Sequence, residues 1–197
     1  MHSRLTMLVP LLFAAGLAHA VPFLVQVQDG AGRPLADAVV AVQVHGQGGR
    51  TTAPAAAQMA QKDRQFQPAV LVVQTGTAVS FPNLDSVRHH VYSFSAARKF
   101  DIKLYAGTPA QPEVFDKAGV VTLGCNIHDQ MSAHIVVVDT PVFGKSDAGG
   151  RVTLDLPPGD HVLGYWHPKL GGDALKTRPL QSGSAPGRTT LTLATSE

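Results

Sequence analysis

Cysteine is nearly absent from this chain of 197 residues, in which Cys125 is the only one. An intramolecular disulfide is therefore excluded. The first twenty residues predict export to a compartment where paired cysteines are normally oxidised, so a lone thiol would be unusual there. Three explanations stay open at this point: a buried and inert thiol, a disulfide to another chain, or a thiolate held by a metal.

Clusters of lysine and arginine are also absent. Sixteen basic residues are spread along the chain against fourteen acidic ones, which gives a formal net charge of +2. Loss of Arg4 with the N-terminal segment would lower this charge to about +1. Since no basic stripe is available for phosphates, the composition suggests neither a nucleic-acid partner nor a membrane-surface partner.

Long apolar runs occur only at the start of the chain. Residues 1–20, MHSRLTMLVPLLFAAGLAHA, combine a basic start, an apolar run and a small-residue exit. The run is shorter than the roughly 20 apolar residues that a bilayer requires, and the exit fits an A-x-A cleavage site. We expect a cleaved signal peptide over residues 1–20, export to the periplasm and no membrane span in the mature protein. A retained membrane anchor is the alternative.

No stretch sustains a helical apolar period over several turns. Short runs rich in Val, Thr, Phe and Leu instead alternate with Gly, Pro, Asn and Asp, a pattern that predicts an all-β protein built from sandwiches. The expected strands are 23–28, 38–44, 69–73, 78–81, 89–94, 113–115, 119–124, 133–138, 152–154, 161–166 and 189–193.

Two distant segments have the strand and turn pattern of a single unit. They are FLVQVQDGAGRPLADAVVAVQV near the start and KSDAGGRVTLDLPPGDHVLGYWHP after residue 144, and their Asp, Gly and Pro residues suit tight turns. Together they resemble the carboxypeptidase regulatory-like β-sandwich, whose two pieces are normally adjacent. The resemblance implies a discontinuous domain over 21–47 and 141–197, with a second domain inserted at 48–140. We predict a connection into the insert at 47–58 and a mobile loop at 171–187.

The segment GCNIHDQM carries the most specific chemistry in the sequence. It places Cys125, His128 and Met131 three residues apart after an expected strand. A strand would send such side chains to alternating faces, whereas a tight turn between two strands can gather them around one point. Thiolate, imidazole and thioether are soft or borderline donors that suit copper in both oxidation states.

A further imidazole is available upstream, in FPNLDSVRHHVYSF. Strand alternation sends His89 and His90 to opposite faces, so only one of them is expected to point at the site. His-x-Val after a strand, followed by Cys-x-x-His-x-x-Met, resembles the cupredoxin family and particularly the short ligand loop of amicyanin. QKDRQFQPAVLVV, GTAVSFPN and KFDIKLY add a resemblance to plastocyanin-like methylamine utilization proteins, which covers residues 58 to 139.

This resemblance implies a Greek-key cupredoxin sandwich with one copper ion. His89 matches the upstream ligand, Cys125 the thiolate, His128 the second imidazole and Met131 the axial thioether. Cupredoxins usually have asparagine after the upstream histidine, where it ties the two ligand loops together. This chain has His90 at that position, so His90 is the alternative ligand and otherwise a candidate for the tie.

Each of these residues also has a simpler interpretation. A lone Cys, Met or His is more often a core or hydrogen-bonded residue, but their order, spacing and compartment together favour a metal. Zinc suits the two imidazoles and the thiolate, whereas it suits a thioether poorly. Met59 is a possible replacement for Met131 and is expected to be packing. His45, His134, His161 and His167 are expected to be structural, and Trp166 to lie in a core or an interdomain contact.

The sequence therefore predicts a one-electron carrier that is not an enzyme and that works between redox proteins, such as a cytochrome and a periplasmic dehydrogenase. Two alternatives remain. One is a copper-handling protein that does not turn over electrons, and the other is an adhesion or carbohydrate-binding sandwich in which Cys125 is incidental.

Overall fold

The computed structural model describes residues 19–45 and 56–194. Within them, regular structure is β-strand apart from one short 3-10 helix, η1 (Pro168–Leu170), which confirms the predicted all-β class. None of the described residues forms a helix long and apolar enough to cross a membrane. Most of the predicted signal peptide, residues 1–18, and most of the predicted connection, residues 46–55, lie outside the described residues.

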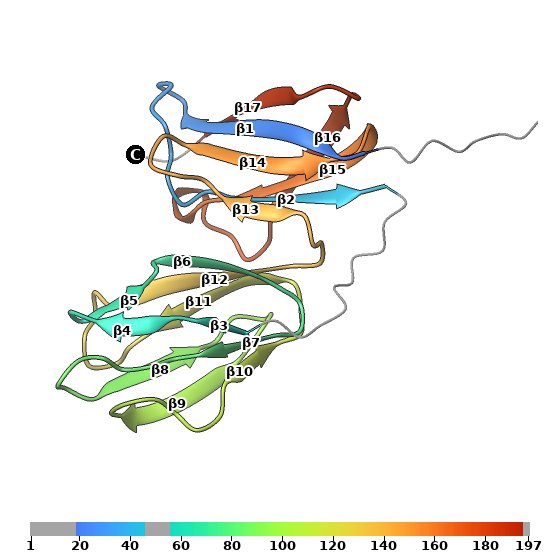
Figure 1. The fold of residues 1–197 in the computed structure, drawn as a ribbon. Helices are drawn as coiled ribbons and strands as arrows, with labels where there is room; N and C mark the ends of the chain where they lie inside the picture. The colour runs from blue at the N-terminus through green and yellow to red at the C-terminus, as the bar shows by residue number, and fades with distance from the viewer. Residues whose placement is uncertain (1–18, 46–55, 195–197) are drawn as a thin grey trace, which may run out of the picture.

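The strands form two sandwiches, one above the other in Figure 1. The first, which we call the outer sandwich, consists of a sheet β14-β1-β17 and a sheet β13-β2-β15-β16. Its strands come from both ends of the chain: β1 (Val21–Asp29), β2 (Val39–Val44), β13 (Phe143–Lys145), β14 (Arg151–Leu156), β15 (Gly159–Trp166), β16 (Lys176–Ser182) and β17 (Gly187–Leu193).

The second, which we call the inner sandwich, lies between β2 and β13 in sequence. A sheet β10-β7-β3 faces a larger sheet β6-β12-β11-β8-β9, and β4 pairs with β5 beside them. The strands are β3 (Ala56–Gln58), β4 (Ala60–Lys62), β5 (Gln65–Gln67), β6 (Val70–Gln74), β7 (Thr77–Ser80), β8 (His89–Ser93), β9 (Phe100–Tyr105), β10 (Glu113–Phe115), β11 (Gly119–Gly124) and β12 (Ser132–Val138).

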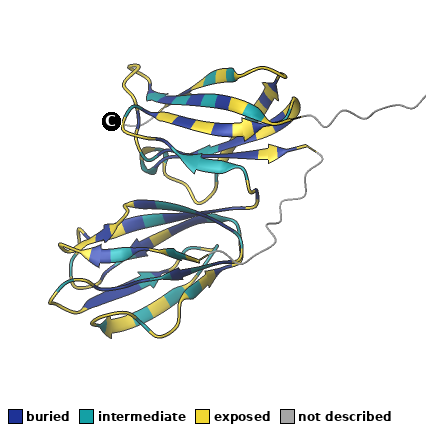
Figure 2. Cartoon of the chain, in the orientation of Figure 1, coloured by how far each residue is buried: buried dark blue, intermediate teal, exposed yellow. Residues whose placement is uncertain are grey.

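Strand β12 shows why some strands of this chain are unbroken apolar runs in the sequence. Ile135 and Val137 point into the core of the inner sandwich, whereas Val136 and Val138 point the other way, into a cluster shared with the outer sandwich. Side chains alternate between the faces of a strand, so an unbroken apolar run indicates a strand that is buried on both faces. The larger inner sheet is thus covered on one side by its own sandwich and, along β12, by the outer one, where Figure 2 shows dark, buried strands.

Trp166 lies at this contact between the two sandwiches. A core or an interdomain contact was predicted for it, and the structure shows the second. Its side chain is buried with Val39, Val136 and other residues of the shared cluster, and its indole N–H donates to the carbonyl of Gly171 at 3.1 Å. Its ring also contacts His134 of β12, with ring centroids 4.9 Å apart.

The predicted mobile loop at 171–187 is wrong over residues 176–182. Residues 176–182 form β16, which pairs antiparallel with β15. β16 is the edge of its sheet and most of its residues are exposed, so its sequence, KTRPLQS, has too few apolar residues to show a strand pattern.

We expect Trp166→Ala to lower the free energy of unfolding by about 3 to 5 kcal/mol, because truncating a buried tryptophan removes its contacts and leaves a cavity. Urea denaturation followed by circular dichroism measures the change. Phe94→Ala is the matched control, since Phe94 is 78% exposed, and surface substitutions usually change stability by less than about 0.5 kcal/mol. Equal losses in the two variants would contradict the buried contact.

Stability should also fall in mild acid, because burial lowers the pKa of His134 from its ordinary value of 6.5. Burial also lowers the pKa of His167, against the opposing effect of its bond to the Ala36 carbonyl. As the pH falls below 6.5, the unfolded chain therefore binds more protons at these histidines than the folded chain does. This part of the stability is lost progressively as the pH falls from 6.5 toward the lowered pKa values of the folded protein. The urea midpoint of the metal-free protein should drop between pH about 7.5 and about 5, and less in His134→Gln. An unchanged drop in that variant would contradict the assignment to His134.

Candidate metal centre

The candidate centre is the loop between β11 and β12, together with the start of β8. β11 and β12 are antiparallel neighbours, with Gly124 opposite Ser132. Cys125, His128 and Met131 therefore lie in the connection between two paired strands, as the spacing predicted. The backbone N–H of Met131 donates to the carbonyl of His128 at 2.8 Å, which tightens the second half of this loop.

Strand register brings His89 to the same place. β8 runs antiparallel to β11, with Tyr92 opposite Gly124. Stepping back from Tyr92 to His89 moves in the same direction as stepping forward from Gly124 into the loop, so His89 comes to lie beside it. Gly124 permits the close approach of Tyr92 on β8 to β11, since a Cβ at position 124 would lie 2.7 Å from the ring of Tyr92.

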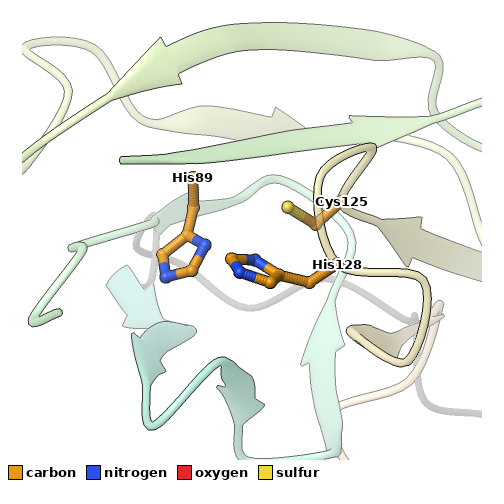
Figure 3. A group of neighbouring side chains, drawn as sticks. All are labelled: His89, Cys125 and His128. Carbon is orange, nitrogen blue, oxygen red and sulfur yellow. The ribbon is translucent and has the colours of Figure 1, made fainter. Parts of the chain in front are cut away.

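Three donors converge as a result. One ligand atom from each of His89, Cys125 and His128 lies within 4.8 Å of the other two, and Figure 3 shows the three side chains directed toward one another. The two imidazole ring centroids are 5.1 Å apart with a tilt of 58°. His89 and Cys125 are buried and His128 is partly exposed.

The hydrogen bonds of these groups leave nitrogen atoms free for a metal. Nε2 of His89 lies 2.7 Å from a carboxylate oxygen of Asp85, while Nδ1 of His89 and Nδ1 of His128 are buried without a hydrogen-bond partner. Buried polar atoms without partners are costly. A metal bound by both imidazoles and the thiolate would satisfy them, and this mixed nitrogen and sulfur set suits copper or zinc better than calcium or magnesium.

Met131 and Met59 are both buried, in the same core cluster as Cys125. Met131 also lines a surface hollow with Cys125, Asn126 and Asp129. The role of Met131 as the axial ligand stays a prediction, and so does the role of Met59 as a packing residue.

His90 occupies the opposite face of β8, as strand alternation requires. Its Nε2 pairs with the carboxylate of Asp101 on β9, and its Nδ1 has no hydrogen-bond partner. The prediction that His90 ties the two ligand loops together is therefore wrong: its hydrogen bond joins β8 to β9, because the ring points away from the loop. His45, His134, His161 and His167 likewise lie outside the converging group.

Sequence reasoning did not identify the residues that support His89. The Asp85 carboxylate contacts Nε2 of His89. The side-chain NH₂ group of Asn83 donates to the carbonyls of Val87 and Tyr105 at 2.8 and 3.0 Å. Burial raises the pKa of Asp85, but hydrogen bonds from the Arg64 backbone N–H, from His89 and from the Asp63 backbone N–H outweigh it, so that this pKa is lowered overall. The spacing of four residues between Asp85 and His89 was the only available signal.

Tyr105 packs against the core cluster that contains Cys125. Its hydroxyl donates to the carbonyl of Phe81 at 2.6 Å and also contacts the amide of the buried Gln61. Burial raises the pKa of Tyr105 to about 12, so this side chain remains a neutral hydrogen-bond donor at physiological pH.

No family model and no curated protein matches the chain. Several solved structures are similar to part of it. A purple cupredoxin from Nitrosopumilus maritimus is 23% identical, with a TM-score of 0.37, over 42% of this chain and 99% of that one. The reduced Cu(I) form of an amicyanin variant is 16% identical, with a TM-score of 0.39, over 50% of this chain and 98% of that one. A copper-containing nitrite reductase from Thermus scotoductus is 22% identical, with a TM-score of 0.41, over 59% of this chain and 28% of that one.

Substitution of the two buried methionines should separate ligand from packing. In a copper-loaded protein, we expect Met131→Leu to raise the reduction potential and shift the visible spectrum, because a thioether donor is lost. Met59→Leu should leave both unchanged and cost less than about 1.5 kcal/mol of stability, as volume-conserving core changes do. The reverse pattern would make Met59 the axial ligand.

Proposed function

We propose that the protein is a mononuclear type 1 copper protein of the cupredoxin type that carries single electrons between redox proteins and is not an enzyme. His89, Cys125 and His128 would hold the copper, with Met131 as the axial ligand. The observation that carries the proposal is the convergence of two imidazoles and the only thiol of the chain within 4.8 Å. Bound copper would supply a Cu(II)/Cu(I) couple that accepts one electron and releases it again.

The chain's own residues suit this role by fixing the donors before any ion arrives. His89 is held by Asp85, and Cys125 and His128 lie in a short loop between two paired strands. Val91, Leu123 and Ile135 are fully or almost fully buried in the core that also contains Cys125. A rigid, mostly dry site keeps one geometry in both oxidation states, which fast electron transfer requires.

Partner contact would take place around His128, the only one of the three converging residues that is not buried. The neighbouring Ile127 is 45% exposed, and Leu84 and Val87, in the segment before His89, are 61% and 40% exposed. Exposed apolar side chains next to a redox centre suit a small, transient protein interface. The proposed partners are redox proteins such as a cytochrome or a periplasmic dehydrogenase.

The proposed location is the periplasm, reached through a signal peptide cleaved after residue 20. A lone cysteine in an oxidising compartment is explained if a metal holds it as thiolate. We also propose that residues 21–47 and 141–197 form a carboxypeptidase regulatory-like domain into which a cupredoxin domain, 48–140, is inserted. This division is in keeping with the strand pairing of the described residues, in which each sheet is built either from strands within 21–44 and 143–193 or from strands within 56–138.

Addition of Cu(II) to the purified mature protein tests the proposed function. We expect an intense visible absorption from the thiolate, lost in Cys125→Ala and strongly weakened or lost in His89→Ala. His90→Ala is the matched control and should keep the colour, because the His90 ring pairs with Asp101. A colourless wild-type complex would contradict the carrier. A coloured complex with an inaccessible or sluggish Cu(II)/Cu(I) couple would identify a copper-handling protein instead.

A further inference from the structure

Among the residues that the structure describes, Asp85 is the only one whose side chain hydrogen-bonds to the converging group of His89, Cys125 and His128. Its Oδ2 lies 2.7 Å from Nε2 of His89, whose side chain is 0% exposed, while the Asp85 side chain is 14% exposed. The imidazole side of this contact is shielded from water, which reduces the screening between the carboxylate charge and the ring.

The carboxylate is itself held in place by the turn between β4 and β5. The backbone N–H of Asp63 donates to Oδ1 at 2.8 Å and that of Arg64 to Oδ2 at 3.0 Å. Asp63 and Arg64 have φ values of 55° and 59°, a left-handed conformation that is unfavourable for residues other than glycine, asparagine and aspartate. The two bonds to Asp85 stabilise this turn and aim both N–H groups at one carboxylate.

Asp85 is also fixed from its own backbone. Its N–H donates to Oδ1 of the buried Asn83 at 3.0 Å, and the amide group of Asn83 donates in turn to the carbonyls of Val87 and Tyr105. One acidic side chain thus joins the β4–β5 turn, the segment before β8 and the imidazole of His89. Such an arrangement leaves the carboxylate little freedom to move away from the ring.

This contact determines which nitrogen of His89 is available. Beside a carboxylate, Nε2 carries the proton and donates it, so Nδ1 is left bare, and Nδ1 is the buried nitrogen without a partner. A carboxylate behind a metal-bound imidazole also makes the ring a stronger donor, which favours the more highly charged Cu(II) over Cu(I). Within the described residues, His128 has no such carboxylate contact, so the effect is confined to one ligand.

We propose that Asp85 is a positioning residue that fixes the tautomer of His89 and, through its charge, lowers the reduction potential of the copper centre. The second half of this inference rests on the proposed function. The first half concerns the metal-free protein and stands independently of it.

The tautomer is measured on metal-free wild-type protein by two-bond ¹H–¹⁵N NMR of the histidine rings. We expect Nε2 of His89 to carry the proton and Nδ1 to be bare. A proton on Nδ1 would overturn the positioning role without the need for any variant.

The charge effect is measured by titration and voltammetry of the copper-loaded protein. Asp85→Asn should weaken Cu(II) binding by about 10- to 100-fold, and each tenfold loss not shared by Cu(I) raises the potential by about 59 mV. Asp129→Asn is the charge-matched control, because Asp129 is exposed and follows His128 directly in sequence. Asp85→Glu, which keeps the charge, should restore part of the difference.

A shift in Asp85→Asn no larger than in Asp129→Asn would overturn the charge effect. If instead the wild-type protein gives no absorption that depends on Cys125, the proposed copper function fails, and the NMR measurement still decides whether Asp85 positions His89.

Discussion

The site depends on two buried imidazole nitrogens that no group of the described residues satisfies, and on the buried thiol beside them. Nδ1 of His89, Nδ1 of His128 and the thiol of Cys125 belong to side chains from two separate segments, and the two nitrogens are buried without hydrogen bonds. Leaving such atoms unpaired costs free energy. A fold that nevertheless brings them together is explained when a metal ion completes their interactions, and the nitrogen and sulfur donors suit copper or zinc.

The surrounding architecture holds these donors from several directions. The antiparallel register of β8, β11 and β12 sets the positions of His89 and the ligand loop. Asp85 and Asn83 brace the segment before β8. The outer sandwich contributes from further away, since Trp166 and the shared apolar cluster bury the outward side chains of β12. At the edge formed by β8 and β9, the larger sheet has exposed apolar residues such as Phe94, directly after β8, and Leu104 on β9.

Much of this arrangement could be predicted from the sequence, because its strongest patterns come from buried strands and from a dense donor motif. The apolar runs of β2, β11 and β12 follow from burial on both faces, and GCNIHDQM requires a turn to gather its side chains. Edge strands could not be identified in this way. β16, KTRPLQS, carries charged and polar residues along most of its length, so it lacks the apolar pattern, and residues 176–182 were wrongly predicted as part of a loop. β9, FDIKLY, does alternate apolar with charged residues, but it was not predicted as a strand.

The supporting residues of the site were missed for a related reason. Asp85 resembles any aspartate in a turn, and its role depends on two N–H groups contributed by residues more than twenty positions earlier. His90 was wrongly predicted to tie the ligand loops, because strand β9, which places Asp101 beside His90, was not recognised. Sequence patterns indicate which residues can coordinate, whereas strand pairing determines which partners orient them.

The proposed function requires that one copper ion be held by one thiolate and two imidazoles. X-ray absorption spectroscopy at the copper edge of the loaded wild-type protein tests it most directly, because this method identifies the atoms bound to the metal. The account predicts one short sulfur ligand together with two nitrogen ligands that show imidazole scattering. A first shell of only nitrogen and oxygen, without sulfur, would contradict it.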